Sequence, residues 1–83
     1  AAAGEKAGLP MDLAYRLAKT TVAGAGELAR QSEDSASQLR VNVTSPGGTT
    51  AAALEVLMDE DGIQPIVDRA IEAASRRSKE LAG

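Results

Sequence analysis

The stretch Thr-Ser-Pro-Gly-Gly-Thr-Thr at residues 44–50 is the part of this 83-residue sequence best suited to chemistry. Its two consecutive glycines precede an Ala-rich segment and cost conformational entropy, so something should require them. Hydroxyl groups that can donate or accept hydrogen bonds accompany them: Ser45, Thr49 and Thr50. The start of a helix presents unpaired N–H groups and the positive end of the helix dipole. These residues are compatible with a small pocket for a carboxylate or phosphate. Taken alone, they favour a Ser-capped, Pro-started helix without a ligand.

Two other motifs suggest ligands but fail on context. Residues 24–29 match Gly-x-Gly-x-x-Ala, the dinucleotide fingerprint. The pattern lies inside an amphipathic helical segment, without a preceding strand and without an acidic residue at 44–50, so it predicts close helix–helix contact instead. Residues 59–62, Asp-Glu-Asp-Gly, do not follow the ligand register of a calcium loop and predict a solvated turn.

Charge and residue types exclude several kinds of site. Cys and His are both absent, which removes disulfides, thiolate nucleophiles and the commonest metal ligands. We therefore expect no metal site. The basic cluster at residues 76–79 falls in the last turns of a helix, where positive charge complements the dipole. With a net charge of −3 and no basic patch, a nucleic-acid partner is not expected.

Apolar spacing predicts an all-α fold of about four helices, because no segment alternates like a half-buried strand. We expect helices over residues 11 to about 30, 37–42, 49 to about 60 and 63 to about 81, with residues 1–7 as the frayed end of another. Several local features are expected within them: Pro10 in a first helical turn, an Asp61–Gln64 capping box, and ion pairs Glu72–Arg76 and Arg76–Glu80.

A chain of this composition is expected to need a partner. Seventeen of its 36 apolar residues are Ala and Tyr15 is its single aromatic residue, so little large side-chain area is available for a core. A domain this short hides only about 60% of its unfolded surface. The simplest partner is a second copy of the chain. No apolar run approaches the roughly 20 residues of a membrane helix, and with no signal peptide visible we expect a cytoplasmic protein.

A longer pattern around residues 44–50 changes the interpretation of that stretch. From Ala36 the sequence runs small-x-x-Leu-x-x-x-Val-Thr-Ser-Pro-Gly-Gly-Thr-Thr-x-x-Ala-Leu-x-x-Leu, ending at Leu57. This resembles the signature of pyrroline-5-carboxylate reductases. The Gly-Leu-Pro at residues 8–10 and the closing helix are also similar to that family's C-terminal region. Ala36 stands where the family often has Pro, and Val41 where an acidic or amide residue is usual.

The resemblance implies that residues 1–83 form one C-terminal dimerisation and substrate-binding domain, intertwined as a homodimer. The family reduces 1-pyrroline-5-carboxylate to L-proline with NAD(P)H, the last step of proline biosynthesis, and many members assemble as rings of dimers. Its cofactor is bound by an N-terminal Rossmann domain, which these 83 residues do not include. The chain alone is therefore expected to bind no cofactor and to be inactive.

The resemblance also assigns roles within the glycine-rich turn. It implies that the substrate carboxylate meets the Ser45 hydroxyl and the backbone N–H groups of Gly48 and Thr49, with Gly47 in the same binding turn. Thr50, the one candidate catalytic residue, is expected to hydrogen-bond the ring nitrogen. The alternative is a purely structural helical oligomerisation module whose turn holds no ligand. A third interpretation, an independent anion-binding protein, is weakest because the core is thin.

Overall fold

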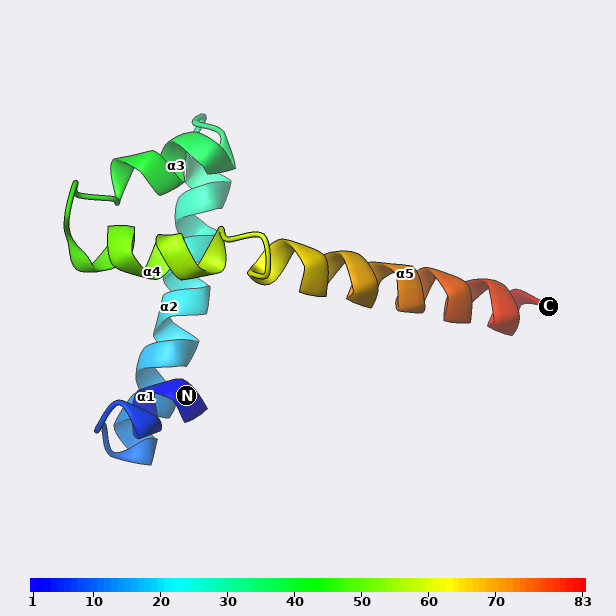
Figure 1. The fold of residues 1–83 in the computed structure, drawn as a ribbon, viewed down its shortest axis with the longest axis horizontal. Helices are drawn as coiled ribbons and strands as arrows, with labels where there is room; N and C mark the ends of the chain where they lie inside the picture. The colour runs from blue at the N-terminus through cyan, green and yellow to red at the C-terminus, as the bar shows by residue number, and fades with distance from the viewer. The chain divides into compact units, whose positions relative to one another are not determined.

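The structure, a computed structural model, describes all 83 residues. Helices are its only regular secondary structure, which confirms the predicted all-α fold class (Figure 1). Its five helices are α1 (Ala2–Lys6), α2 (Met11–Gln31), α3 (Ala36–Asn42), α4 (Thr49–Leu57) and α5 (Ile63–Ala82). The chain divides into two compact units, Ala1–Val41 and Asn42–Gly83. No helix combines the length and the apolar character that a membrane crossing requires.

The first unit is built on a hairpin of α1 and α2, which pack against each other. Gly4 faces Ala14 so closely that a Cβ on Gly4 would lie 3.1 Å from the Ala14 Cβ. The connection is held by a hydrogen bond of 3.1 Å from the Leu9 N–H to the Gly4 carbonyl. Ala14 is only 3% exposed and is the one buried hydrophobic residue of the chain. The hairpin therefore depends on small side chains, which supply little buried area.

Helix α2 begins at Met11, as predicted, but Pro10 does not take the place expected for it. Pro10 lies at the N-cap, with φ −57° and ψ 142°, and is not part of the first turn. Its extended ψ places it outside the helix, while its carbonyl accepts the first helical hydrogen bond from the Ala14 N–H at 2.9 Å. Gly24 and Gly26 have open space where a Cβ would stand, so the close helix–helix contact predicted for them is not made within the first unit.

The C-terminal turn of α2 carries a small polar cluster. Glu27 accepts hydrogen bonds from Arg30 Nε at 3.0 Å and from Gln31 Nε2 at 2.7 Å. The Arg30 bond, and then the Gln31 bond, hold the pKa of the Glu27 carboxyl below its usual value. A depressed carboxyl pKa stabilises the folded state above the unfolded-state pKa, and this contribution is lost as the pH falls through the folded-state value. Because the pair is solvent-exposed, its contribution is small.

Short polar side chains organise the connection from α2 to α3. The Ser32 hydroxyl oxygen accepts a hydrogen bond from the Asp34 N–H at 3.0 Å. Ser35 acts as the N-cap of α3, because its hydroxyl oxygen accepts the Gln38 N–H at 3.1 Å. The cap explains why α3 begins at Ala36, one residue before the predicted start.

In the second unit, a tight turn joins α4 to α5. Helix α4 ends at Leu57, short of the predicted end near residue 60, because the acidic residues after it form this turn. The Gly62 N–H donates to the Asp59 carbonyl at 2.9 Å. A Cβ on Gly62 would lie 2.2 Å from the Leu57 carbonyl oxygen, a distance that no side chain can occupy. The turn therefore requires glycine at this position.

Helix α5 differs from the prediction in its side-chain pairs. Its N-cap is Gly62, which makes no side-chain cap, so the predicted capping box is wrong. Gln64 instead donates from Nε2 to Asp68 Oδ1 at 2.7 Å. The Glu72–Arg76 ion pair is confirmed at 3.2 Å. The other predicted pair, Arg76–Glu80, is not formed: Arg76 already bonds Glu72, and Glu80 pairs with Arg77 at 3.0 Å.

Replacing Gly62 by Ala should destabilise the chain, because the added methyl group meets the Leu57 carbonyl. Relieving that overlap requires a backbone shift, and overpacking of this kind costs about 1–3 kcal/mol. The free energy of unfolding, measured by chemical denaturation at one fixed protein concentration, should fall by that amount. Glu60→Ala, in the same turn but with an exposed side chain, is the matched control and should change stability little. Equal stabilities for Gly62→Ala and the parent chain would contradict the turn geometry.

Candidate functional site

The turn between α3 and α4 is set by three consecutive residues, Pro46, Gly47 and Gly48. The Gly48 N–H donates to the Ser45 carbonyl at 3.0 Å, which closes a four-residue turn. Gly47 has φ +72°, in the left-handed region that favours glycine. Pro followed by a residue of positive φ is the pattern of a type II turn. The pattern Ser-Pro-Gly-Gly therefore encodes its own backbone geometry.

Gly48 also lies close to the start of the turn. A Cβ at this position would be 3.2 Å from the Ser45 carbonyl oxygen and 3.4 Å from the Ser45 Cβ. Its own backbone is extended, with φ −87° and ψ −176°, and it is the N-cap of α4. Each glycine thus has its own steric reason. Gly47 adopts a positive φ, and Gly48 avoids a tight contact between a Cβ and the Ser45 carbonyl.

Helix α4 leaves a group of backbone donors beside this turn. Its first intrahelical bond runs from the Ala52 N–H to the Gly48 carbonyl at 3.1 Å. Helix geometry therefore leaves the N–H groups of Thr49, Thr50 and Ala51 without an intrahelical acceptor. The Gly48 N–H, which was expected to bind a carboxylate, is already engaged with Ser45. The Ala51 donor was missed in the sequence, because its role depends on the helix starting at Thr49.

The side chains around the turn are polar but uncharged. Ser45 and Thr49 are exposed, and Thr50 is partly buried. No group of three or more acidic, Cys or His residues is placed to hold a metal ion. The structure thus brings three predicted hydroxyl residues and a helix N-terminus into one segment, which suits a small anion that accepts hydrogen bonds.

The Gly-x-Gly-x-x-Ala stretch does not fit a nicotinamide cofactor. Gly24, Gly26 and Ala29 all lie within α2, which is continuous from Met11 to Gln31. The dinucleotide motif needs a strand before the glycines and a helix that begins among them, so that the pyrophosphate meets a helix N-terminus. Mid-helix N–H groups are bonded within the helix and cannot fulfil that role.

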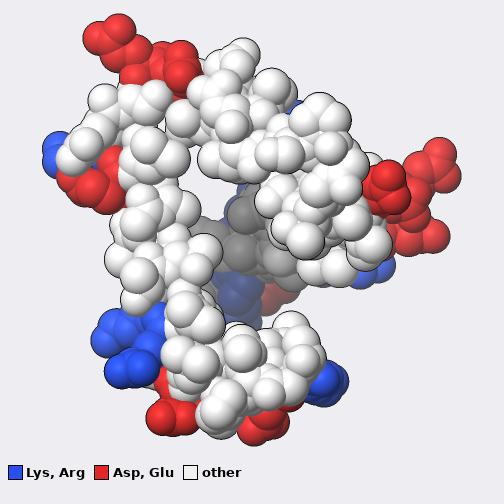
Figure 2. Space-filling view, turned by 90° about the vertical axis from the view of Figure 1, so that its left-hand side faces the viewer, with Lys and Arg blue, Asp and Glu red and all other residues white.

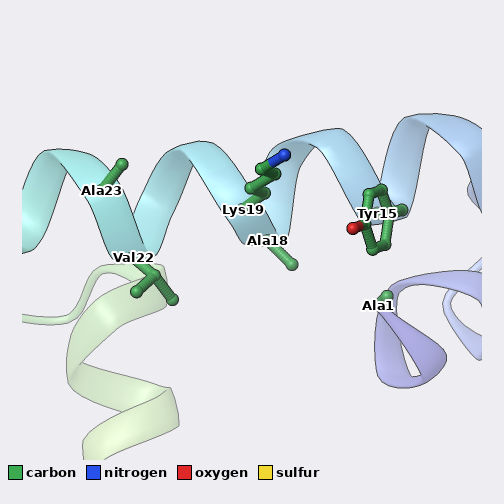
Figure 3. A pocket seen from close by; sticks show the side chains of 6 residues that line it. All are labelled: Ala1, Tyr15, Ala18, Lys19, Val22 and Ala23. Atoms are coloured by element: carbon green, nitrogen blue, oxygen red, sulfur yellow. The ribbon is translucent and has the colours of Figure 1, made fainter.

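Apolar side chains form open grooves on both units. Figure 3 shows the larger one on α2, a groove of about 540 Å³ lined by Ala1, Tyr15, Ala18, Lys19, Val22 and Ala23. Tyr15 is 59% exposed and Val22 is 75% exposed. Sequence reasoning identified the apolar spacing of α2 but did not anticipate this groove, because it depends on where α1 lies.

Charged groups are dispersed over the face of the molecule that Figure 2 shows. On the face drawn in Figure 2, basic and acidic side chains lie in small separate groups with uncharged surface between them. Figure 2 thus shows no broad positive patch of the kind that binds nucleic acid. The uncharged surface is the more distinctive feature of this chain.

Comparison with known proteins gives one consistent result. Residues 1–81 match the family model for pyrroline-5-carboxylate reductase dimerisation. The chain is 46% identical over 80 residues to the pyrroline-5-carboxylate reductase of Pseudomonas aeruginosa, which covers 96% of this chain and 29% of that protein. It is 45% identical over 78 residues to the Synechocystis enzyme of the same name, covering 94% of this chain and 29% of that protein.

A plant relative shows the same relation. The pyrroline-5-carboxylate reductase of Pisum sativum is 46% identical over 78 residues, covering 94% of this chain and 28% of that protein. The chain therefore spans less than a third of the length of these curated relatives. Because the family model matches almost every residue, the chain belongs to the pyrroline-5-carboxylate reductase dimerisation family.

Proposed function

We propose that this chain is the C-terminal dimerisation and substrate-positioning domain of an enzyme that reduces 1-pyrroline-5-carboxylate to L-proline with NAD(P)H, in the cytoplasm. The observation that carries the proposal is the family match across residues 1–81. It is supported by the turn before α4, whose backbone donors and hydroxyl groups suit a ligand bearing a carboxylate. Residues 1–83 then act as one domain, in which a second copy of the chain covers the apolar surface that the two units leave exposed.

Within the turn, backbone groups and a hydroxyl bind the substrate carboxylate. The Ser45 hydroxyl donates one hydrogen bond, and the Thr49 N–H donates another from the positive end of the α4 dipole. Gly47 and Gly48 form the floor of the site, where the absence of side chains lets the carboxylate approach the backbone. Because the Gly48 N–H bonds Ser45, its donor role passes to the next N–H groups along the helix.

Thr50 is proposed to act on the other end of the substrate. Reduction of the ring C=N bond adds a hydride to carbon, while the π electron pair of the bond moves to the ring nitrogen, which gains a proton. A hydroxyl held beside the nitrogen stabilises the charge that changes there. The Thr50 side chain is partly buried, whereas that of Thr49 is exposed, so Thr50 is better shielded from competing water.

Self-association follows from the uncovered apolar surface. Sixteen large hydrophobic side chains between Leu9 and Leu81 are 37–75% exposed, and only Ala14 is buried. Stable interfaces bury about 1,200–2,000 Å² in total, and apolar burial contributes about 25 cal/mol per Å². A homodimer that covers these faces therefore supplies the core that one copy does not contain.

The 83-residue chain should behave as a dimer in solution. Sedimentation equilibrium at micromolar concentration should give about twice the chain mass of 8.5 kDa. Helix content measured by circular dichroism should fall on dilution, because helices of this length need packing for stability. A fully helical species at the monomer mass would contradict this expectation.

The isolated chain should not bind the nicotinamide cofactor, because Gly24 and Gly26 lie in mid-helix. Isothermal titration calorimetry with NADPH and NADH should show no binding heat above dilution. A micromolar dissociation constant would instead assign a nucleotide site to these 83 residues and contradict the proposal that they position the substrate without binding the cofactor.

In the complete reductase, Thr50→Val should lower kcat/KM for pyrroline-5-carboxylate. The change keeps the branched shape and removes one hydrogen bond to a group whose charge changes. Such a bond is worth about 1.5–3 kcal/mol, or roughly 10- to 150-fold in rate. The KM for the cofactor should change little. Steady-state kinetics with each substrate varied in turn will measure both effects.

Thr49→Val is the matched control, since Thr49 is proposed to act through its backbone N–H, which the substitution keeps. Its kcat/KM should stay closer to that of the parent enzyme. Near-normal kcat/KM for Thr50→Val, in an enzyme that remains dimeric, would remove Thr50 from its proposed role and favour a turn that is only structural.

A further inference from the structure

A groove on the second unit lies where α4 meets α5. It measures about 270 Å³, and the side chains that line it are mostly large and apolar: Val56, Leu57, Ile63 and Ile66, together with Asp61 and Gly62. Val56 is 71% exposed and Ile66 is 56% exposed, so this apolar surface is uncovered. Asp61 is its only charged residue. At Gly62 the backbone passes so close to the Leu57 carbonyl that no Cβ would fit there.

A complementary face lies on α2, in the first unit. Leu13, Arg16, Leu17 and Thr20 line a shallow groove of about 300 Å³. Their spacing of three and four residues places them on one side of the helix. Leu17 is 48% exposed, and Arg16 is the only charged residue of this face. Each of the two surfaces thus combines apolar side chains with a single charge, and the two charges are opposite.

We propose that the α2 face around Leu13, Arg16 and Leu17 docks into the α4–α5 groove of a second copy of this chain, with Arg16 pairing to Asp61. This inference rests on the self-association proposed above and names its surfaces. In a two-fold dimer the same contact is made twice, because each copy contributes one face and one groove. Leu13 and Leu17 fill the apolar groove, and the ion pair sets the orientation.

Neighbouring charges are compatible with this pairing. Asp12 lies one turn before Arg16 on α2. Because an exposed ion pair at that spacing is weak, Asp12 competes little with Asp61 for Arg16. Asp59 and Glu60 stand beside Asp61 in the turn, so the groove end of the second unit is acidic and attracts a guanidinium. A second copy is favoured over an unrelated partner because the family to which this chain belongs is a dimerisation family and because both complementary surfaces are present on one chain.

Charge reversal and mixing test the contact directly. Arg16→Glu and Asp61→Arg should each raise the dimer dissociation constant by about 10-fold or more, since each homodimer then holds two like-charged contacts. In an equimolar mixture, the heterodimer has one contact with reversed charges and one parental contact. Association measured by sedimentation velocity should therefore return to within about threefold of the parent chain. The recovery also shows that both variants fold.

Arg76→Glu is the matched control, because it makes the same change in charge on α5, where Arg76 pairs with Glu72. Arg76→Glu alone should dimerise like the parent chain. Its heterodimer with Asp61→Arg keeps one like-charged contact, so mixing should not bring the Asp61→Arg chain back to parental association. If Arg16→Glu/Asp61→Arg in one chain restores association but mixing does not, the contact forms within one chain and the proposal is wrong. A parent chain that dimerises while neither reversal weakens it overturns this surface and leaves self-association intact. A monomeric parent chain overturns both.

Discussion

The uncovered apolar surface of the helices is the constraint on which the rest of this structure depends. Within the chain, only Ala14 is buried among the hydrophobic residues, and it lies against Gly4 in the α1–α2 hairpin. Alanine contributes little transfer free energy, so this contact cannot offset the conformational entropy of ordering 83 residues. The remaining free energy must come from covering the large apolar side chains with another surface. Dimerisation is, in this sense, part of the folding of the chain.

The turn before α4 is stabilised by local backbone geometry and not by the burial of apolar surface. Pro46 restricts φ, Gly47 adopts a positive φ, and the Gly48 N–H closes the turn on Ser45, all within four residues. None of these interactions needs a tertiary core. The candidate site can therefore keep its shape in a chain whose packing depends on a partner, because local backbone geometry fixes the direction of the first N–H groups of α4. A site that must meet a substrate held partly by other residues benefits from such local order.

The sequence predicted the features that rest on a periodic pattern of many residues, such as the long helices. It did not predict those that depend on one dihedral angle or one rotamer, such as the helix caps and some ion pairs. Apolar spacing located the long helices, and the Gly-Gly pair located the turn. The predicted capping box failed because Gly62 is the N-cap of α5, and no pattern of polar residues shows that a carbonyl lies 2.2 Å from its missing Cβ. The sequence also could not show that Glu80 pairs with Arg77, because Arg76 and Arg77 both lie within one helical turn of it. Periodicity averages over many residues, whereas caps and pairs depend on one rotamer or one dihedral angle.

On the two proposals, the positions of the candidate site and of the groove on α4 connect association with substrate binding. The candidate site lies at the N-terminal end of this helix, at Gly48 and Thr49, and the groove lies at its C-terminal end, at Val56 and Leu57. A nine-residue helix spans about 13 Å and moves as a rigid element. On the inference drawn above, docking a second copy in the groove also fixes the orientation of the turn at the other end of the helix. On the proposed function, the partner copy does more than supply buried area: it holds the carboxylate-binding N–H groups in one place relative to the rest of the enzyme. Preorganisation of this kind lowers the barrier for a reaction in which the protein's main task is positioning.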